Sequence, residues 1–188
     1  MASASISVPK KKVAKPPLDI HTMGDRVLRQ DAKRVSQVND EIRQLVRDML
    51  QTMYSADGIG LAAPQVGVHK RLIVIDPDPQ NTSTPPLVLI NPEIRGYGND
   101  IVLAQEGCLS IPDVYLDVKR PEAIEVTFKD ERGRPRRAKM NGLAARVVQH
   151  EIDHLEGVLF VDRVENAILR DRELKQYGFN SRDVIPLT

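Results

Sequence analysis

The chain has 188 residues, of which 41% are hydrophobic and 28% are charged, a composition typical of a soluble globular protein. Its length fits one domain, because single hydrophobic cores typically serve ~100–200 residues. No apolar run approaches the ~20 residues that cross a bilayer, and the first residues lack the apolar core of a secretory signal. Lys plus Arg (27) nearly balances Asp plus Glu (26), which argues against a broad basic surface for nucleic acid. We therefore expect no membrane partner and no direct sequence-specific binding to nucleic acid.

The positive charge is concentrated at the start of the chain. Residues 1–16 hold Lys10, Lys11, Lys12 and Lys15 and no acidic residue, and Pro16-Pro17 follow. Charge runs of this kind are usually solvated and flexible. We predict a flexible basic leader over residues 1–17 and a single folded domain over residues 18–188, with a targeting or docking role of the leader as the alternative.

Periodicity predicts an α+β fold. Apolar residues recur at helical spacing between 38 and 53, where Asn39 is a candidate N-cap, and again between 142 and 155, where Gly157 is placed to end the helix. Between these helices, residues 72–76 and 87–90 are β-branched runs typical of buried strands, and residues 124–128 and 136–139 indicate a hairpin with a turn at 130–134. Helix, strands and helix in this order favour α+β over a parallel doubly wound sheet.

The strongest local pattern is His150-Glu151-Ile152-Asp153-His154, which matches H-E-x-x-H. On a helix the two histidines lie one turn apart and can both bind one metal ion, while Glu151 points ~100° away and suits a general base. The apolar residues Leu143 and Val147 continue the histidine stripe, which places the rings on or beside the buried face. The alternative is a helix with two solvent-facing histidines and a salt-bridging glutamate.

A catalytic metal site generally needs a third protein ligand. No histidine follows His154, but Glu156, Glu165 and Glu173 are downstream carboxylates. The upstream candidate is Cys108, the single cysteine, which cannot form an intrachain disulfide. A small buried hydrophobic role is the alternative for Cys108.

Three segments together resemble the peptide deformylase family: Gly58-Ile-Gly-Leu-Ala-Ala-Pro-Gln65, Glu106-Gly-Cys-Leu-Ser110 and Gln149-His-Glu-Ile-Asp-His154. They occur in the family's order, and the likeness runs from about residue 20 to about residue 163. The resemblance implies antiparallel sheets packed around a central metal-binding helix. It also implies that Cys108, His150 and His154 bind the metal and that Glu151 is the catalytic acid/base.

The family removes the N-formyl group from formylmethionine at the start of new polypeptides and releases formate. By resemblance the cofactor is one divalent ion, ferrous iron (Fe²⁺) first, with Zn²⁺, Ni²⁺ or Co²⁺ as replacements. The developing oxyanion then meets the Gln65 side-chain amide and the backbone N–H of Leu109.

We expect the substrate peptide to pair with the chain near Ile59 and Gly60 as an added strand. The resemblance gives Glu106 and Gly107 pocket and substrate-backbone roles, although composition alone predicts a loop there. Leu143 and Val147 are candidate walls of the methionine pocket. Many relatives have an arginine where this chain has Tyr115, so we expect contacts beyond the first substrate residues to differ.

The remaining expectations concern location, partners and alternatives. The activity implies bacterial cytoplasm or an organelle of bacterial descent, with N-formylmethionyl nascent peptides as partners. We expect a monomer, although nothing in the sequence determines the oligomeric state. The charged segment 170–175 fits a solvated helix, with ribosome docking as the alternative. The competing functions are a zincin-type metalloprotease, which lacks its downstream ligand here, and a non-catalytic ribosome-binding module, which needs neither Glu151 nor Gln65.

Overall fold

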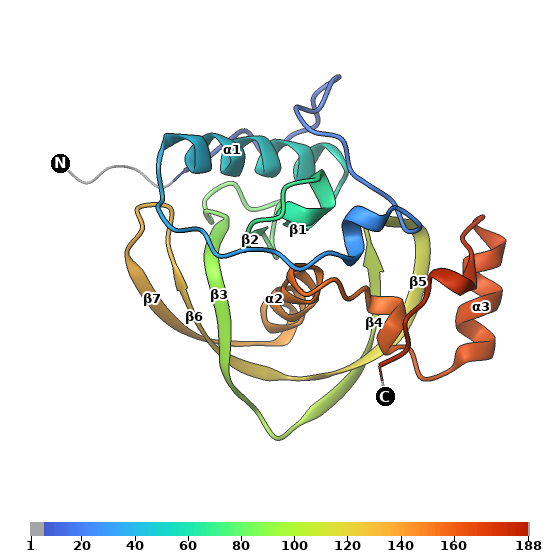
Figure 1. Ribbon diagram of the computed structural model, residues 1–188. Helices are drawn as coiled ribbons and strands as arrows, with labels where there is room; N and C mark the ends of the chain where they lie inside the picture. Colours follow the sequence, from blue (N-terminus) through green and yellow to red (C-terminus); the bar gives the residue numbers. More distant parts are fainter. Residues whose placement is uncertain (1–5, 188) are drawn as a thin grey trace.

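The computed structural model describes residues 6–187 and contains two antiparallel sheets with helices around and between them (Figure 1). The larger sheet has the strand order β1-β2-β3-β6-β7, and β4 pairs with β5 in a separate two-stranded ribbon. The strands are β1 (Gly60–Ala62), β2 (Leu72–Ile75), β3 (Leu87–Tyr97), β4 (Ile101–Cys108), β5 (Ile111–Pro121), β6 (Ala123–Lys129) and β7 (Pro135–Asn141). The α-helices are α1 (Asp40–Ser55), α2 (Gly142–Leu155) and α3 (Ala167–Gln176). The predicted α+β class is confirmed.

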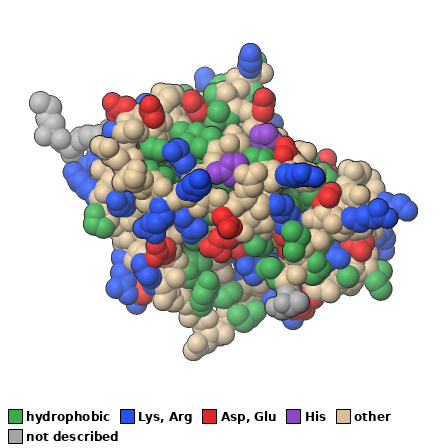
Figure 2. All heavy atoms as spheres, viewed as in Figure 1, with side chains coloured by type: hydrophobic (Ala, Val, Ile, Leu, Met, Phe, Trp, Pro, Cys, Tyr) green, Lys and Arg blue, Asp and Glu red, His purple; other side chains and the backbone are tan. Residues whose placement is uncertain are grey.

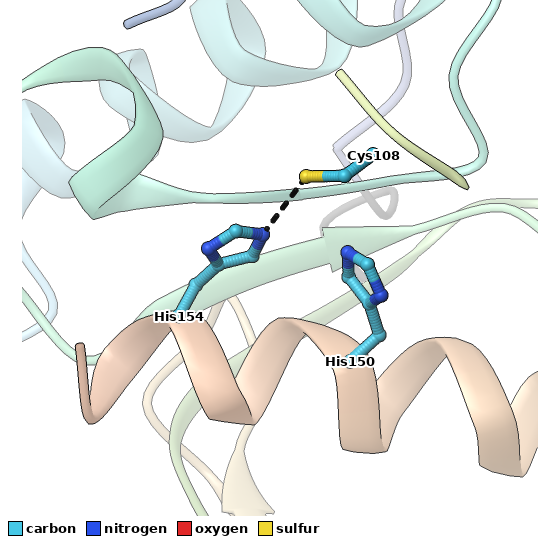
Figure 3. A group of neighbouring side chains, drawn as sticks. All are labelled: Cys108, His150 and His154. Carbon is cyan, nitrogen blue, oxygen red and sulfur yellow. Dashed lines mark hydrogen bonds between the residues drawn. The ribbon is translucent and has the colours of Figure 1, made fainter. Parts of the chain in front are cut away.

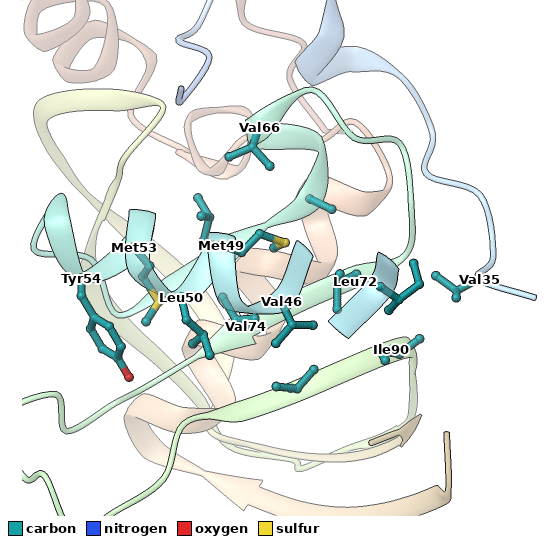
Figure 4. Packing of buried hydrophobic residues seen from close by; sticks show 14 residues of the cluster. Val35, Val46, Met49, Leu50, Met53, Tyr54, Val66, Leu72, Val74 and Ile90 are labelled. Atoms are coloured by element: carbon teal, nitrogen blue, oxygen red, sulfur yellow. The ribbon is translucent and has the colours of Figure 1, made fainter. Parts of the chain in front are cut away.

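Helix α1 covers one face of the larger sheet. The Asn39 side chain accepts a hydrogen bond from the backbone N–H of Ile42, as expected of an N-cap, and the helix lies within two residues of the predicted 38–53. Its buried stripe packs on β1, β2 and β3 (Figure 4), and Met49 and Met53 are completely buried in it. These methionines are therefore core residues.

Helix α2 lies at the centre of the molecule, between the larger sheet and the β4–β5 ribbon (Figure 1). Ala145, Val148 and Ile152 pack against the sheet. Gly157 ends the helix with φ +68°, and a Cβ there would lie 2.9 Å from the Arg29 backbone. The opposite side of α2 faces the ribbon, and this arrangement places the histidines between the two sheets.

The ribbon corrects the prediction of a loop at Glu106 and Gly107, because both residues belong to β4. Strand β5 alternates buried and exposed positions, with Val114, Leu116 and Val118 on the buried side. That period-two pattern is the feature of the sequence from which strand β5 could have been predicted. In β4, the consecutive residues Ile101, Val102 and Leu103 are all exposed, so this strand lacks the alternation of a half-buried strand.

Both ends of the described chain contact the rest of the fold. Val8 packs on the α1 cluster, and the Val13 and Leu18 amides bond to side chains of α1. The described part of the leader, residues 6–17, thus makes defined contacts with α1, while residues 1–5 lie outside the described part. Helix α3 includes the predicted charged segment, but Leu174 is fully buried against β5, so its surface is not wholly solvated.

On the face in Figure 2, acidic and basic side chains are interspersed without a continuous basic field. Among residues 6–187, no helix combines the length and apolar content needed to span a bilayer.

Candidate metal centre and active site

Cys108 and two histidines converge at the junction of the ribbon and α2 (Figure 3). Cys108 ends β4, while His150 and His154 project from the same side of α2. One donor atom from each residue lies within 4.8 Å of the others, and the distance from Cys108 Sγ to His154 Nε2 is 3.3 Å. The spatial convergence predicted for these three side chains is therefore present.

The three donors fit a divalent metal ion. A tetrahedral ion with bonds of about 2.0–2.3 Å holds its ligand atoms roughly 3.3–3.8 Å apart, so small side-chain adjustments bring this group to coordination distance. One sulfur and two imidazole nitrogens suit iron, zinc, cobalt and nickel. Burial lowers the pKa of His154 well below its usual value, and the neighbouring His150 acts in the same direction. Its ring is therefore neutral, as metal binding requires.

A buried network of charged groups fixes the orientation of His150. Its Nδ1 lies 3.0 Å from Glu106 Oε2, and Arg120 donates to both oxygens of Glu106, at 2.6 and 2.9 Å. Burial raises the pKa of Glu106, but the hydrogen bonds from His150 and Arg120 outweigh burial and hold that pKa well below its usual range. Arg120 also donates to Asp153 on α2 at 2.8 Å. A carboxylate behind a ligating histidine typically sets its tautomer and orientation.

The sequence reasoning missed parts of this network. Arg120 is 3% exposed and Asp153 is 5% exposed, so both are charged side chains in the interior. Arg146 also donates to Glu106, at 2.8 Å. No pattern in a single sequence pairs Arg120 with Glu106, although Arg120 continues the period-two buried face of β5.

Gln65 lies beside the cysteine sulfur with its amide orientation fixed. Its Oε1 accepts from the Ala62 N–H at 2.8 Å, so its Nε2 faces the other way, 3.0 Å from Ser110 Oγ and 3.6 Å from Cys108 Sγ. The Ser110 N–H also donates to this sulfur, at 3.4 Å. Gln65 thus presents an N–H donor directly beside the metal ligands.

Glu151 is 4% exposed, and its Oε2 has no hydrogen-bond partner among the described residues. Burial is the main reason that the pKa of Glu151 rises to about 7. A general base works best when its pKa lies near the working pH. A buried carboxylate with a free oxygen beside three metal ligands is suited to exchanging protons with a reacting molecule.

The absence of a side chain at Gly60 leaves the space that Glu151 occupies. A Cβ at Gly60 would overlap Glu151 Oε1 and lie 2.8 Å from Val147 Cγ1. We expect Gly60→Ala to lower kcat/KM by about 10²-fold, because a shift of about 1 Å in a catalytic group has that effect. Steady-state turnover measures the loss, and Gly96→Ala is the control because nothing lies within 4 Å of a Cβ at Gly96. Equal activity of the two variants would contradict this role of Gly60.

A cavity of about 630 Å³ opens onto the centre. Every predicted site residue except His154 lines it: Ile59, Gly60, Gln65, Glu106, Gly107, Cys108, Leu109, Leu143, Val147, His150 and Glu151. Leu143 is 52% exposed, so it lies at the mouth of the cavity. Tyr115 also lines the cavity, and its ring lies over Gly107, where a Cβ would come within 2.5 Å of Tyr115 Cε1.

The alternative third ligands lie elsewhere. Glu156 pairs with Arg71 at 3.6 Å, and Glu165 pairs with Lys119 at 2.9 Å. Within residues 6–187, the group with metal-binding geometry consists of Cys108 and the two histidines, with no downstream carboxylate. The ligand arrangement of a zincin-type protease is therefore not present in the described chain.

Comparison with known proteins agrees with this geometry. Residues 17–168 match the family model described as Polypeptide deformylase. The chain is 61% identical to a peptide deformylase of Microchaete diplosiphon over 184 residues, covering 98% of both chains. It is 62% identical to a peptide deformylase crystal structure from Synechococcus elongatus in complex with actinonin, with a TM-score of 0.96 and coverage of 98% of this chain and 100% of that one. A Thermotoga maritima structure is 40% identical, with a TM-score of 0.74 and coverage of 79% and 97%.

An α+β fold with a buried Cys-His-His centre, a carboxylate and an open cavity defines a metal-dependent hydrolase. The family match covers most of the chain, and curated relatives match it over nearly their full length. The chain belongs to the polypeptide deformylase family. Its activity is the hydrolysis of the N-formyl group from formylmethionine at the start of new polypeptides.

Proposed function

We propose that Glu151 is the acid/base of this deformylase and that Cys108, His150 and His154 hold one divalent ion. The ion, when bound, supplies acidification of water and polarisation of the formyl carbonyl. Glu151 takes a proton from the attacking water at its free Oε2 and passes it to the leaving amine. The observation that carries this proposal is the unpartnered, buried carboxylate oxygen beside the three ligands.

Gln65 Nε2 and the Leu109 N–H are the proposed donors to the negative charge that develops on the formyl oxygen. The support for Gln65 is its fixed amide, held through Oε1 by the Ala62 N–H. Leu109 follows Cys108 directly and lines the same cavity. Donors that are oriented before the reaction do not need to reorganise during it.

Replacing Gln65 tests this assignment. We expect Gln65→Ala to lower kcat by about 10²–10³-fold with a smaller change in KM, because the lost donor acts mainly in the transition state. Steady-state formate release gives both constants. Gln105→Ala is the matched control, since Gln105 lines the same cavity but does not belong to the group of Cys108, His150 and His154. A kcat reduced no more in Gln65→Ala than in the control would remove Gln65 from the oxyanion site.

The substrate peptide is proposed to add as a strand beside Ile59 and Gly60. Strand β1 is at the edge of the larger sheet, so one side is free to pair with an extended chain. Leu143 and Val147 provide apolar walls for the methionine side chain. Gly107 is the proposed contact for the substrate backbone, next to the Tyr115 ring that packs on it. Glu106 supports the pocket by holding His150 through its Nδ1.

The ion we propose is Fe²⁺, with Zn²⁺, Ni²⁺ and Co²⁺ as replacements, since one thiolate and two imidazoles accept all four. We further propose that residues 18–188 act as a single catalytic domain, as a monomer, in the bacterial cytoplasm or an organelle of bacterial descent. N-formylmethionyl nascent peptides are the partners, and docking of the chain on the ribosome remains a proposal for α3.

The direct test is a formate-release assay on formyl-Met-Ala-Ser after anaerobic purification, with metal analysis of the same sample. We expect formate and a free amino terminus, with the Met-Ala and Ala-Ser bonds intact. The readout by mass spectrometry separates the alternatives, since cleavage of an internal bond indicates a protease. Metal binding with no product of either kind indicates a non-catalytic module.

A further inference from the structure

Lys10, in the leader, has a buried ammonium group. The side chain is 7% exposed and Nζ lies 2.6 Å from Oδ2 of Asp76, which is fully buried. Nζ also donates to the backbone carbonyls of Asn81 at 2.8 Å and Thr84 at 2.7 Å. An ammonium has three N–H donors, so these three acceptors satisfy it completely. The segment between β2 and β3 therefore forms a closed acceptor site around this one group.

Asp76 depends on Lys10 for charge compensation. Its other contacts are neutral, with Tyr54 Oη donating to Oδ2 at 2.7 Å and the Asp78 N–H donating to Oδ1 at 3.2 Å. Within residues 6–187, Lys10 is the cation within 4.0 Å of this carboxylate. Removing one partner of a buried ion pair leaves an uncompensated charge, which is strongly destabilising. The contact thus differs from ordinary surface ion pairs.

The same aspartate supports the edge of the substrate site. The Asp76 N–H donates to the Ile59 carbonyl at 2.8 Å, and the preceding Ile75 pairs with Gly60 in the sheet. Ile59 and Gly60 line the cavity. A change in the position of Asp76 is therefore transmitted through one backbone hydrogen bond to the strand edge that faces the substrate.

The leader continues from this anchor towards the rim of the cavity. Gln51 Nε2 donates to the Lys11 carbonyl at 2.8 Å, and Lys12 Nζ lies 2.5 Å from Asp57 Oδ2 at the cavity rim. The Lys12 and Asp57 side chains are 62% and 72% exposed, so this pair contributes little. Lys10 makes the buried ion pair of this stretch, in addition to the packing of Val8 and the Val13 hydrogen bond to α1.

We infer that Asp76 and the carbonyls of Asn81 and Thr84 form a binding site for a primary alkylammonium group, which Lys10 fills from within the chain. The leader is thereby anchored as a strap that positions the Ile59–Gly60 edge. The anchoring of the leader is inferred from the contacts of Lys10 alone. Its effect on substrate binding rests on the proposed function. No such site follows from the sequence, because Lys10 is one of four lysines in the leader.

The first test compares Lys10→Ala with Lys11→Ala in the full-length protein. We expect Lys10→Ala to melt about 5 °C or more below the wild type, from the loss of a buried pair in a chain of this size. Lys11→Ala should melt like the wild type, because Lys11 contributes its carbonyl and an exposed side chain. Equal melting of the two variants would overturn the anchor.

Chemical rescue tests the chemistry of the site. Propylammonium replaces the atoms that Lys10→Ala removes, so it should raise the melting temperature of this variant and not that of the wild type or Lys11→Ala. Tetramethylammonium, which has no N–H donor, is the matched cation. Equal effects of both cations, or none from propylammonium, would overturn the assignment of an alkylammonium site.

Kinetics then test the strap. We expect Lys10→Ala, assayed well below its melting temperature, to raise KM for formyl-Met-Ala-Ser about 3-fold or more with kcat little changed, since substrate binding and not chemistry is disturbed. An unchanged KM would show that Lys10 contributes to stability only, and would overturn the role of the leader in positioning the Ile59–Gly60 edge. Because melting and rescue need no activity, failure of the deformylase assay in the wild type would leave the anchor to be judged separately.

Discussion

Glu151→Gln is expected to lower kcat for formate release by about 10²–10⁴-fold while the protein keeps its fold and its metal. Glutamine matches the size of glutamate but cannot accept the proton. The side chain is 4% exposed, so bulk water has little access to replace it as a base. Saturating formyl-Met-Ala-Ser gives kcat, and metal analysis of the same preparation shows that the ligand set is intact.

A matched control is available at the end of the same helix. Glu156, the C-cap of α2, has a side chain that is 56% exposed and pairs with Arg71. Glu156→Gln should therefore retain wild-type kcat. Formate release by Glu151→Gln at the control's rate would refute the acid/base assignment, and so would a loss of activity explained by a loss of metal.

The helices were predictable because their signals are local. Asn39 caps α1, the apolar stripe has helical spacing, and Gly157 adopts the left-handed conformation that ends α2. The β6–β7 hairpin was predictable for the same reason, since its alternation and turn lie within one short stretch. Strand β1 was not, because three residues are too few to show a period.

The candidate site was predictable only in part. H-E-x-x-H placed His150 and His154 together because one helical turn separates them, but Cys108 lies 46 residues before His154 on another element. Residue spacing alone could not decide whether Cys108 or a downstream carboxylate is the third metal ligand. The three family motifs together indicated Cys108. The burial of Arg120 could not be predicted from the sequence. Its charge is compensated by Glu106 and Asp153, which come close to it only in the folded protein.

The contacts of Lys10 in the leader were not predictable for a related reason. Lysines in a run without acidic residues are normally solvated, and Lys12 follows this rule with a side chain that is 62% exposed. Lys10 departs from it because Asp76 and two carbonyls form a site around its ammonium group. Composition describes the run as a whole and does not distinguish one lysine from its neighbours.

Cys108→Ala is expected to lose the bound metal and to lower formate release by about 10³-fold or more, because the several kcal/mol that the ion contributes are lost with it. Two histidines alone leave the coordination incomplete. Metal analysis after anaerobic purification and a formate assay measure the two effects. A variant that retains one ion per chain would remove Cys108 from the ligand set.

Cys108→Asp separates the loss of a ligand from a change in its chemistry. A carboxylate oxygen binds zinc at about 2.0–2.2 Å, so this variant should hold zinc, whereas the harder oxygen donor should not restore the activity measured for the wild type loaded with Fe²⁺. Ser110→Ala is the control for local packing, since the Ser110 backbone N–H to the sulfur remains in that variant. Loss of metal in Ser110→Ala equal to that in Cys108→Ala would mean that the turn after β4, and not the sulfur, holds the ion.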